Sequence, residues 1–327
     1  MMNVKQWVDK HRPTTLDKII GQQNVVNTLK NGIVKGEMPH MLFYGPPGVG
    51  KTSVITALAY ELFGPNLMID RVLELNASDD RGINTVRKTI RQFAKSALGT
   101  PDPNYPSPPY KIVILDEADA MTNEAQSALR KVMEQYAHIT RFCFICNYIS
   151  NISDPIVSRC AAFRFEQINN NDSLSKLRKI AKQENMQISN GVILYILLIC
   201  DGDIRQSISL MQNANYLNKE ITKDDIQTLR SMPNEEISHE LFKHIGSPNI
   251  NKVHKSVRKI FDSSYPMYFI LAYCNKLIER MEISDINKAK MYVHLANVEA
   301  NMLDGCDEYI ELLNLFLYIN KLMNNSK

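Results

Sequence analysis

A glycine-rich loop, Gly45–Thr52, constrains the fold of this chain more than any other feature. It follows the apolar run Met41–Tyr44 and precedes the helical run Ser53–Phe63, so the expected order is strand, loop, helix. Glycines at positions 45, 48 and 50 let backbone N–H groups turn toward phosphate oxygens, and the helix N-terminus adds positive partial charge. We therefore expect a nucleoside triphosphate at this loop rather than a glycine-rich turn without a ligand.

Two side chains at the end of this loop have expected roles in binding the nucleotide. Lys51 would reach the β and γ phosphates, and Thr52 would offer its hydroxyl to Mg²⁺. The role of Thr52 calls for an acidic partner from elsewhere in the chain, because a phosphate-bound magnesium ion is usually held by one or two carboxylates as well.

A second motif supplies those acids. The apolar run Lys111–Leu115 predicts a buried parallel strand, and it leads directly into Asp116 and Glu117. Ligands of parallel sheets bind at the carboxyl ends of the strands, so both acids should lie near the phosphates. Asp116 would hold the Mg²⁺ shell and Glu117 would polarise the attacking water. The alternative is a strand that ends in a solvated acidic turn.

The first half of the chain alternates short apolar runs with helical ones, which favours an α/β P-loop NTPase fold with a parallel sheet. The expected strands are Met41–Tyr44, Arg71–Leu75, Ile112–Leu115, Phe142–Cys146 and Phe163–Phe165. The segment Gly99–Tyr110 contains five prolines and predicts an exposed, mobile excursion.

From residue 169 onward only helical runs follow. We predict three domains: a nucleotide-binding α/β domain at 1–168, a small helical domain at 169–231 and a helical bundle at 232–327. The expected helices are Leu174–Glu184, Asn190–Cys200, Ile204–Asn215, Lys223–Arg230, Glu235–Ile245, Ile250–Phe261, Tyr265–Met281, Ile286–Asn301 and Cys306–Met323.

Composition narrows the class of protein. With 44% hydrophobic and 22% charged residues in 327, the chain reads as a soluble, intracellular, multidomain protein. The net charge of +3 is too small for a global nucleic-acid footprint, so any basic surface must be local. The longest apolar run, Val192–Cys200, is too short to span a bilayer. Cys143 and Cys146 lie within an apolar run without further ligands, so we expect core thiols rather than zinc.

Five further strings stand out beside the loop and the acids: Trp7–Pro13, Glu74–Asp79, Met121–Glu134, Arg141–Tyr148 and Ser158–Cys160. Together these features resemble an AAA+ ATPase, and more narrowly a small subunit of the replication factor C clamp loader. The likeness covers residues 4 to about 217 and is weak in the last hundred. Within that family, Glu61–Pro65 and the strand after it are most similar to the subunit-4 kind, called subunit 2 in the other naming scheme.

The resemblance implies an AAA+ domain, a helical lid and a helical collar, with ATP and Mg²⁺ as ligands. Asn147 matches the sensor 1 residue that holds the attacking water, and Arg205 matches the sensor 2 arginine at the γ-phosphate. His11 stands where the family usually has tyrosine. The implied ATP-binding residues are Val8, Arg12, Ile20, Gly45, Pro46, Pro47, Gly48, Val49, Gly50, Lys51, Thr52, Ser53, Asn147 and Arg205.

The resemblance gives Arg159 a role outside its own chain: in the family this arginine reaches the ATP of the neighbouring subunit. The alternative is a local salt bridge with Asp154 or another nearby acid. For Arg205 the alternative is a solvated residue at a helix N-terminus, a poor position for a cation.

A basic stripe follows Arg81. Ile83, Val86, Ile90, Phe93 and Ala97 fall on one face of a predicted helix, leaving Arg87, Lys88, Arg91 and Lys95 on the other. Such a stripe can track a phosphate backbone without reading bases, although by itself it is also typical of a solvated face. The family lines a DNA channel with this helix, so the resemblance implies DNA contacts by Arg81, Arg87, Lys88 and Arg91.

The resemblance therefore implies an ATP-hydrolysing subunit of a nuclear hetero-pentamer that loads a sliding clamp onto primer-template DNA in replication and repair. Its expected partners are the other replication factor C subunits, the clamp and the DNA backbone. Two alternatives stay open at this point: an ATP-binding scaffold subunit without turnover, and an AAA+ initiator or helicase.

Overall fold

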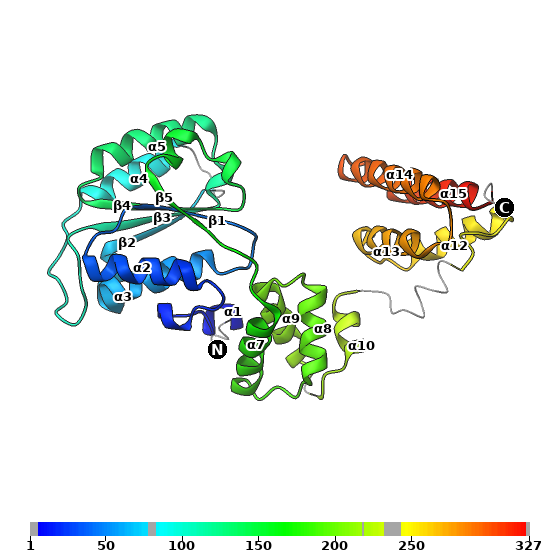
Figure 1. Ribbon diagram of the computed structural model, residues 1–327, viewed down its shortest axis with the longest axis horizontal. Helices are drawn as coiled ribbons and strands as arrows, with labels where there is room; N and C mark the ends of the chain where they lie inside the picture. Colours follow the sequence, from blue (N-terminus) through cyan, green and yellow to red (C-terminus); the bar gives the residue numbers. More distant parts are fainter. Residues whose placement is uncertain (1–5, 78–82, 218, 232–242, 325–327) are drawn as a thin grey trace. The chain divides into compact units, whose positions relative to one another are not determined.

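The computed structural model describes residues 6–77, 83–217, 219–231 and 243–324, with the side chains of residues 83–87 left aside. The chain divides into two compact units, Met1–Glu220 and Ile221–Lys327 (Figure 1). The boundaries of the three expected domains stay a prediction, because this division addresses two units only. No helix in the described parts is long and apolar enough to cross a membrane.

A parallel sheet forms the centre of the first unit, with the strand order β2-β3-β4-β1-β5. Each expected strand is present, with ends shifted by a few residues. Because β1 lies between β4 and β5, the loop that follows β1 opens at the carboxyl edge of the sheet beside both neighbours. The strands are β1 (His40–Tyr44), β2 (Val72–Asn76), β3 (Lys111–Asp116), β4 (Thr140–Cys146) and β5 (Cys160–Arg164).

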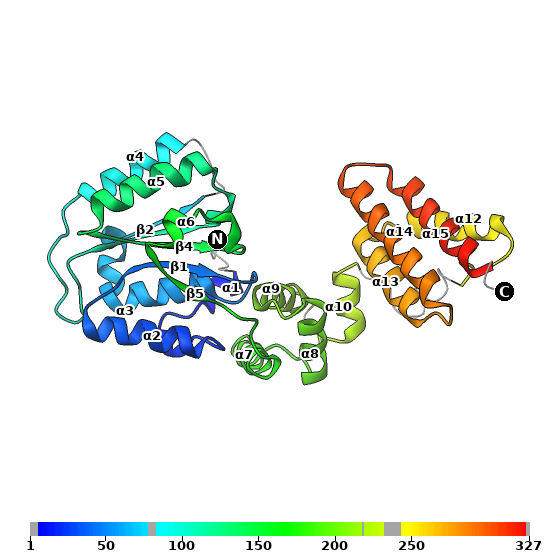
Figure 2. The same cartoon turned by 45° about the horizontal axis from the view of Figure 1, so that its top comes forward.

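Helices cover both faces of this sheet, which confirms the α/β fold class (Figures 1 and 2). On one face α2 (Gln23–Lys35) and α3 (Lys51–Arg71) enclose an apolar core that includes Phe43. On the other, α4 (Ile83–Lys95) and α5 (Asn123–Tyr136) enclose a second core. The central strands are buried on both sides, as their unbroken apolar sequences predict.

Helix α3 is longer than the sequence indicates, because it resumes after a break. Gly64 has φ 67° and ψ 173°, and Pro65 follows it. The expected end at Phe63 therefore marks the break, and the helical run that follows continues to Arg71, where we had expected a strand to begin.

The proline-rich segment 99–110 is exposed over most of its length, as predicted, but two of its residues are buried, and its mobility stays a prediction. Tyr110 and Ser107 are buried, and Ser107 N donates to Leu62 O. The buried Arg71 guanidinium lies within hydrogen-bonding distance of three carbonyl oxygens of the segment, those of Gly99, Pro108 and Tyr110. The prolines leave few N–H donors of their own, so contacts from α3 fasten the segment instead.

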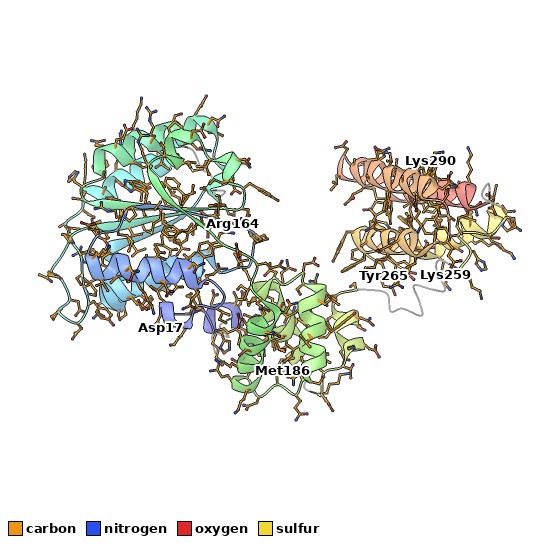
Figure 3. The ribbon with its side chains drawn as sticks, in the orientation of Figure 1. Asp17, Arg164, Met186, Lys259, Tyr265 and Lys290 are labelled. Atoms are coloured by element: carbon orange, nitrogen blue, oxygen red, sulfur yellow. The ribbon has the colours of Figure 1, made fainter. Side chains whose placement is uncertain are left out.

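Short helices complete the first unit. At the N-terminus are α1 (Trp7–Lys10) and the 3₁₀ turn η1 (Leu16–Lys18); η2 (Ala118–Ala120), η3 (Ile149–Asn151) and α6 (Asp154–Val157) lie between strands. A helical bundle follows β5, and polar side chains cap its helices, among them Asn169, Ser189 and Asp203. Met186, labelled in Figure 3, is buried in the segment that connects the first two helices of this bundle. The bundle helices are α7 (Asn170–Gln183), α8 (Asn190–Ile199) and α9 (Ile204–Asn215).

The secondary-structure elements assigned in the described residues of the second unit are all helices, joined by turns. Tyr265 packs against its core, whereas Lys259 and Lys290 are exposed (Figure 3). The expected helix Glu235–Ile245 falls largely outside the described residues. The helices are α10 (Lys223–Leu229), α12 (Ile250–Asp262), α13 (Met267–Arg280), α14 (Asp285–Leu303) and α15 (Glu308–Asn324).

Candidate active site

The glycine-rich loop lies between β1 and α3, in the place that the sequence predicts. All three of its glycines have positive φ: 143° at Gly45, 73° at Gly48 and 96° at Gly50. A β-carbon at Gly45 would lie 2.3 Å from Phe165 O, so the loop passes directly over the end of β5. The glycines are needed both for backbone conformation and for this close approach.

Lys51 is almost fully buried at the first turn of α3, with 7% of its surface exposed. Its ammonium donates to Gly45 O at 2.7 Å, Pro46 O at 2.8 Å and Asn147 Oδ1 at 2.9 Å. Burial lowers the pKa of Lys51, and nearby acidic groups, Asp116 first, act in the opposite direction. The structure thus joins the loop lysine to the asparagine at the end of β4.

A second contact joins the loop to the end of β3. Thr52 Oγ1 donates to Asp116 Oδ2 at 2.8 Å. A hydroxyl and a carboxylate from two different elements are hard oxygen donors, which is the chemistry that Mg²⁺ prefers. The described residues contain no cluster of three or more histidine, cysteine or acidic side chains that could hold a metal by themselves. This donor set fits magnesium, which is usually held by few protein ligands together with water and phosphate.

Glu117 follows Asp116 in a backbone conformation that side chains rarely adopt. Its φ is 53°, and its N–H donates to Asp116 Oδ1 at 2.9 Å. Its side chain is exposed at the carboxyl edge of the sheet. Left-handed backbone at a non-glycine residue costs energy and is concentrated at functional sites.

Asp119 is a site residue whose role the sequence reasoning missed. Its Oδ2 accepts from the backbone N–H groups of Asn147 at 2.9 Å and Tyr148 at 3.2 Å. It therefore fixes the backbone of Asn147 while the side chain of Asn147 meets Lys51. The available signal was the position of Asp119, three residues after Asp116 in the same acidic turn.

Helix α9 reaches the loop through a second residue that was missed, Asp203. A β-carbon at Gly48 would lie only 2.1 Å from Asp203 Oδ1, so this carboxylate lies directly against the loop. The same oxygen caps α9 by accepting from Gln206 N at 3.0 Å. Arg205, the expected sensor 2 residue, is exposed two positions further on.

The N-terminal segment contacts the helical bundle. His11 Nε2 lies 2.5 Å from Glu184 Oε1, and Trp7 N donates to Gln212 Oε1 at 2.9 Å. The histidine that stands in place of the family's tyrosine thus has an acidic partner on the chain. Val8, Arg12 and Ile20 are half-buried, and their place in an adenine pocket stays a prediction.

Arg159 lies on the exposed turn after α6 and forms a local ion pair. Its Nη2 is 2.8 Å from Glu134 Oε1 on α5, and its Nη1 donates to Pro155 O at 2.7 Å. The open alternative of a local salt bridge is confirmed for this chain, with Glu134 as the partner in place of Asp154. The role in a neighbouring subunit stays a prediction.

Two regions of the chain match known families. Residues 41–167 match the ATPase family associated with various cellular activities, and residues 233–318 match the replication factor C C-terminal domain. Replication factor C subunit 2 of Saccharomyces cerevisiae is 41% identical over 97% of this chain and 93% of its own length. The chain belongs to the replication factor C small-subunit family.

Further comparisons agree with this placement. Human replication factor C subunit 4 is 41% identical over 94% of this chain and 86% of its own length. A solved structure of the Thermotoga maritima RuvB Holliday junction branch migration motor matches with a TM-score of 0.53 at 18% identity, over 80% of this chain and 91% of that chain, which shows the fold alone. This replication factor C subunit is therefore a nucleotide-binding AAA ATPase and a component of a multi-subunit clamp loader.

The expected DNA-contacting helix is α4, and its described part departs from the prediction at two positions, Ala97 and Arg91. Ile90 and Ala94 are buried, whereas Ala97 is exposed and lies beyond the helix end at Lys95. Lys88 is exposed, and Arg91 Nε is buried without a hydrogen-bond partner among the described residues. Arg81 lies outside the described residues, as do the side chain of Arg87 and those of the expected apolar positions Ile83 and Val86.

A buried lysine, which sequence reasoning also missed, anchors α4. Lys111 is fully buried, and its ammonium donates to Phe93 O at 2.7 Å, Ser96 O at 2.6 Å and Ser96 Oγ at 2.5 Å. A cation is favourable at a helix C-terminus, where carbonyl groups lack intrahelical donors. Since Lys111 is also the first residue of β3, it ties α4 to the strand that ends in Asp116.

Proposed function

We propose that this chain is an ATP-hydrolysing subunit of a hetero-pentameric clamp loader. The complex opens a ring-shaped sliding clamp and closes it on primer-template DNA during replication and repair, in the nucleus. The observation that supports this proposal is that the expected ATPase groups, apart from the neighbour's arginine, come together at one edge of the sheet. Lys51 contacts Asn147, Thr52 contacts Asp116, and Glu117 follows at the same edge of the sheet.

These groups divide the work of hydrolysis. Lys51 exchanges its carbonyl and amide acceptors for the β and γ phosphates, and backbone N–H groups of the loop hold the other oxygens. Thr52 and Asp116 would hold Mg²⁺, which neutralises charge on the phosphates when it is bound. Asn147 orients the attacking water and Glu117 accepts its proton, a step that needs a base within hydrogen-bond reach.

The remaining positive charge comes from a different subunit. Arg159 lies on the chain's surface, and we propose that it reaches the ATP of the neighbouring subunit, while a neighbour's equivalent group completes the site described above. An arginine that acts in this way stabilises charge on the phosphoryl group in the transition state. Arg205, at the start of α9, would contact the γ-phosphate within the chain.

The exposed side of α4 is the proposed DNA surface. Lys88 is exposed there, Arg91 is half-buried beside it, and Arg81 and Arg87 extend the same stripe in the sequence. Contacts of lysine and arginine with phosphates give affinity that depends on salt and not on base sequence. That suits a complex whose task is to recognise a primed junction wherever it occurs.

Two observations favour this proposal over the alternatives. An idle scaffold subunit would not need Asp116, Glu117 and Asn147 all in place, and they are. An initiator or helicase would need a different C-terminal part, whereas residues 233–318 match the replication factor C C-terminal domain.

Clamp loading by the reconstituted complex tests the proposal. Fluorescent clamp retained on primed circular DNA should accumulate with ATP when this subunit is the parent chain. It should not accumulate over repeated cycles with the Glu117→Gln variant. The matched control is Glu124→Gln, an exposed acid on α5 outside the site. Parent-level loading and ATP turnover with Lys51→Ala would identify the chain as an idle scaffold and overturn the proposal.

A further inference from the structure

Glu134 lies beside Arg159 in a way that the ATPase groups do not explain. The two side chains form the 2.8 Å ion pair across α5 and the turn after α6. Both are exposed, by 45% for Glu134 and 41% for Arg159, so the pair is at the surface rather than in the core. A surface ion pair of this kind adds little to stability, so stability does not account for the contact between these two side chains.

The same carboxylate oxygen faces a second arginine. Arg130 Nε lies 3.8 Å from Glu134 Oε1, one helical turn earlier on α5. Arg130 Nε is buried and has no hydrogen-bond partner among the described residues. One carboxylate between two guanidinium groups leaves a net positive cluster, so an anion can still be attracted to Arg159 while Glu134 holds it.

Arg159 also keeps donors for a further partner. A guanidinium carries five N–H donors in a fixed planar arrangement. Glu134 takes one at Nη2, and Pro155 O and the more distant Ser158 Oγ, at 3.5 Å, both accept from Nη1. Contacts to both terminal nitrogens fix the plane of the group, and the second Nη2 donor and Nε–H can bind phosphate oxygens.

We propose that Glu134 is a positioning residue for Arg159: it holds the guanidinium on the surface of α5 in the orientation that meets the neighbouring subunit's triphosphate. This inference rests on the proposed action of Arg159 in the neighbouring site. A long arginine side chain would otherwise lose rotational freedom each time it engages the phosphate. Fixing it beforehand makes the approach to the transition state more probable.

A double-mutant cycle in the reconstituted complex tests this inference. Glu134→Gln, Arg159→Ala and the double variant are assembled with partners in which only the adjoining ATP site is active. Glu134→Gln should lower kcat at that site roughly tenfold with KM for ATP unchanged, because the arginine acts in the transition state. In the Arg159→Ala background the same change should have no further effect. Glu124→Gln is the matched control.

The outcomes of the cycle separate the positioning role of Glu134 from the trans-acting role of Arg159. If Arg159→Ala slows the adjoining site and Glu134→Gln leaves kcat at the parent value, the positioning role is wrong and the trans-acting arginine stands. An equal loss from Glu134→Gln in both backgrounds also overturns the positioning role, because Glu134 would then act by another route. If Arg159→Ala has no effect on the adjoining site, the proposed trans-acting arginine fails first.

Discussion

Lys51 and Arg159 are two cations of the same domain, one buried and the other exposed at the surface. Lys51 is 7% exposed and is held by three acceptors within its own chain. Arg159 is 41% exposed and is held by a surface carboxylate, one carbonyl and the neighbouring Ser158 hydroxyl. The difference fits the roles proposed for them, since a group that acts within the chain can be built into the sheet edge, whereas one that acts on a neighbour must remain at the surface. Five predictions test this contrast.

Replacing Arg159 should have the largest effect, and it should appear in another subunit. Arginines that stabilise transferring phosphoryl groups accelerate turnover by roughly 10³- to 10⁵-fold, so Arg159→Ala should slow the adjoining site by a comparable factor. ATP affinity of this subunit itself should stay at the parent value. Single-site turnover in the assembled complex measures the first effect, and titration with a fluorescent ATP analogue measures the second.

Replacing Glu117 should act only within the chain. Loss of a general base costs roughly 10²- to 10⁴-fold in rate, so Glu117→Gln should bind ATP normally and turn it over slowly. Calorimetry measures ATP binding, and a coupled assay of phosphate release measures turnover. Turnover at the parent rate would show that another group accepts the proton.

Replacing Lys51 should act on binding. Lys51→Ala removes a buried cation whose charged hydrogen bonds contribute about 1.5–3 kcal/mol each, so ATP affinity should fall roughly a hundredfold. Arg159→Ala is the matched control, since it also removes one positive charge and should leave this affinity unchanged. Equal losses of ATP affinity in the two variants would contradict the contrast between Lys51 and Arg159.

The basic stripe on α4 should give a smaller effect on DNA affinity. Reversing Lys88 and Arg91 to glutamate should weaken DNA binding by the complex and lower the slope of log K against log salt by about two. Reversing Lys259 and Lys290 to glutamate, at exposed positions of α12 and α14, controls for the same change in net charge. If the slope of log K against log salt and the DNA-stimulated ATPase both stay at the parent values, the stripe is only a solvated face.

The smallest effects concern stability, where buried and exposed charges should differ again. Lys111→Met leaves the carbonyls of Phe93 and Ser96 without their donor, which should lower the free energy of unfolding by roughly 1–3 kcal/mol. Glu134→Gln breaks only a surface pair and should cost less than about 1 kcal/mol. Urea unfolding of the two variants measures both.

The sequence was sufficient for the strands and for the acids at their ends. Buried parallel strands read as continuous apolar runs, and side chains that follow them meet at one edge, so Asp116 could be placed beside the loop. Asn147 was placed there through the family resemblance. Capped amphipathic helices such as α9 were also predictable within a residue or two, because their ends have local signals.

Contacts between distant elements were not predictable in the same way. Asp203 lies against Gly48, Lys111 holds the end of α4, and Glu134 pairs with Arg159. Each depends on how two helices or a helix and a strand pack, and no local pattern marks it. The attachment of the proline-rich segment was missed for the same reason, since the residue that fastens it, the buried Arg71, belongs to a different element.

The central claim is that this chain contains the binding half of one ATP site and the arginine of another. Steady-state ATP hydrolysis by the purified chain, shown to be monomeric by light scattering, tests it against the same chain in the assembled complex, with ATP binding measured in both. We expect ATP to bind in both states and turnover to appear only on assembly, with Arg159→Ala in this chain slowing the adjoining site. Hydrolysis by the proven monomer at the rate of the complex would contradict the claim.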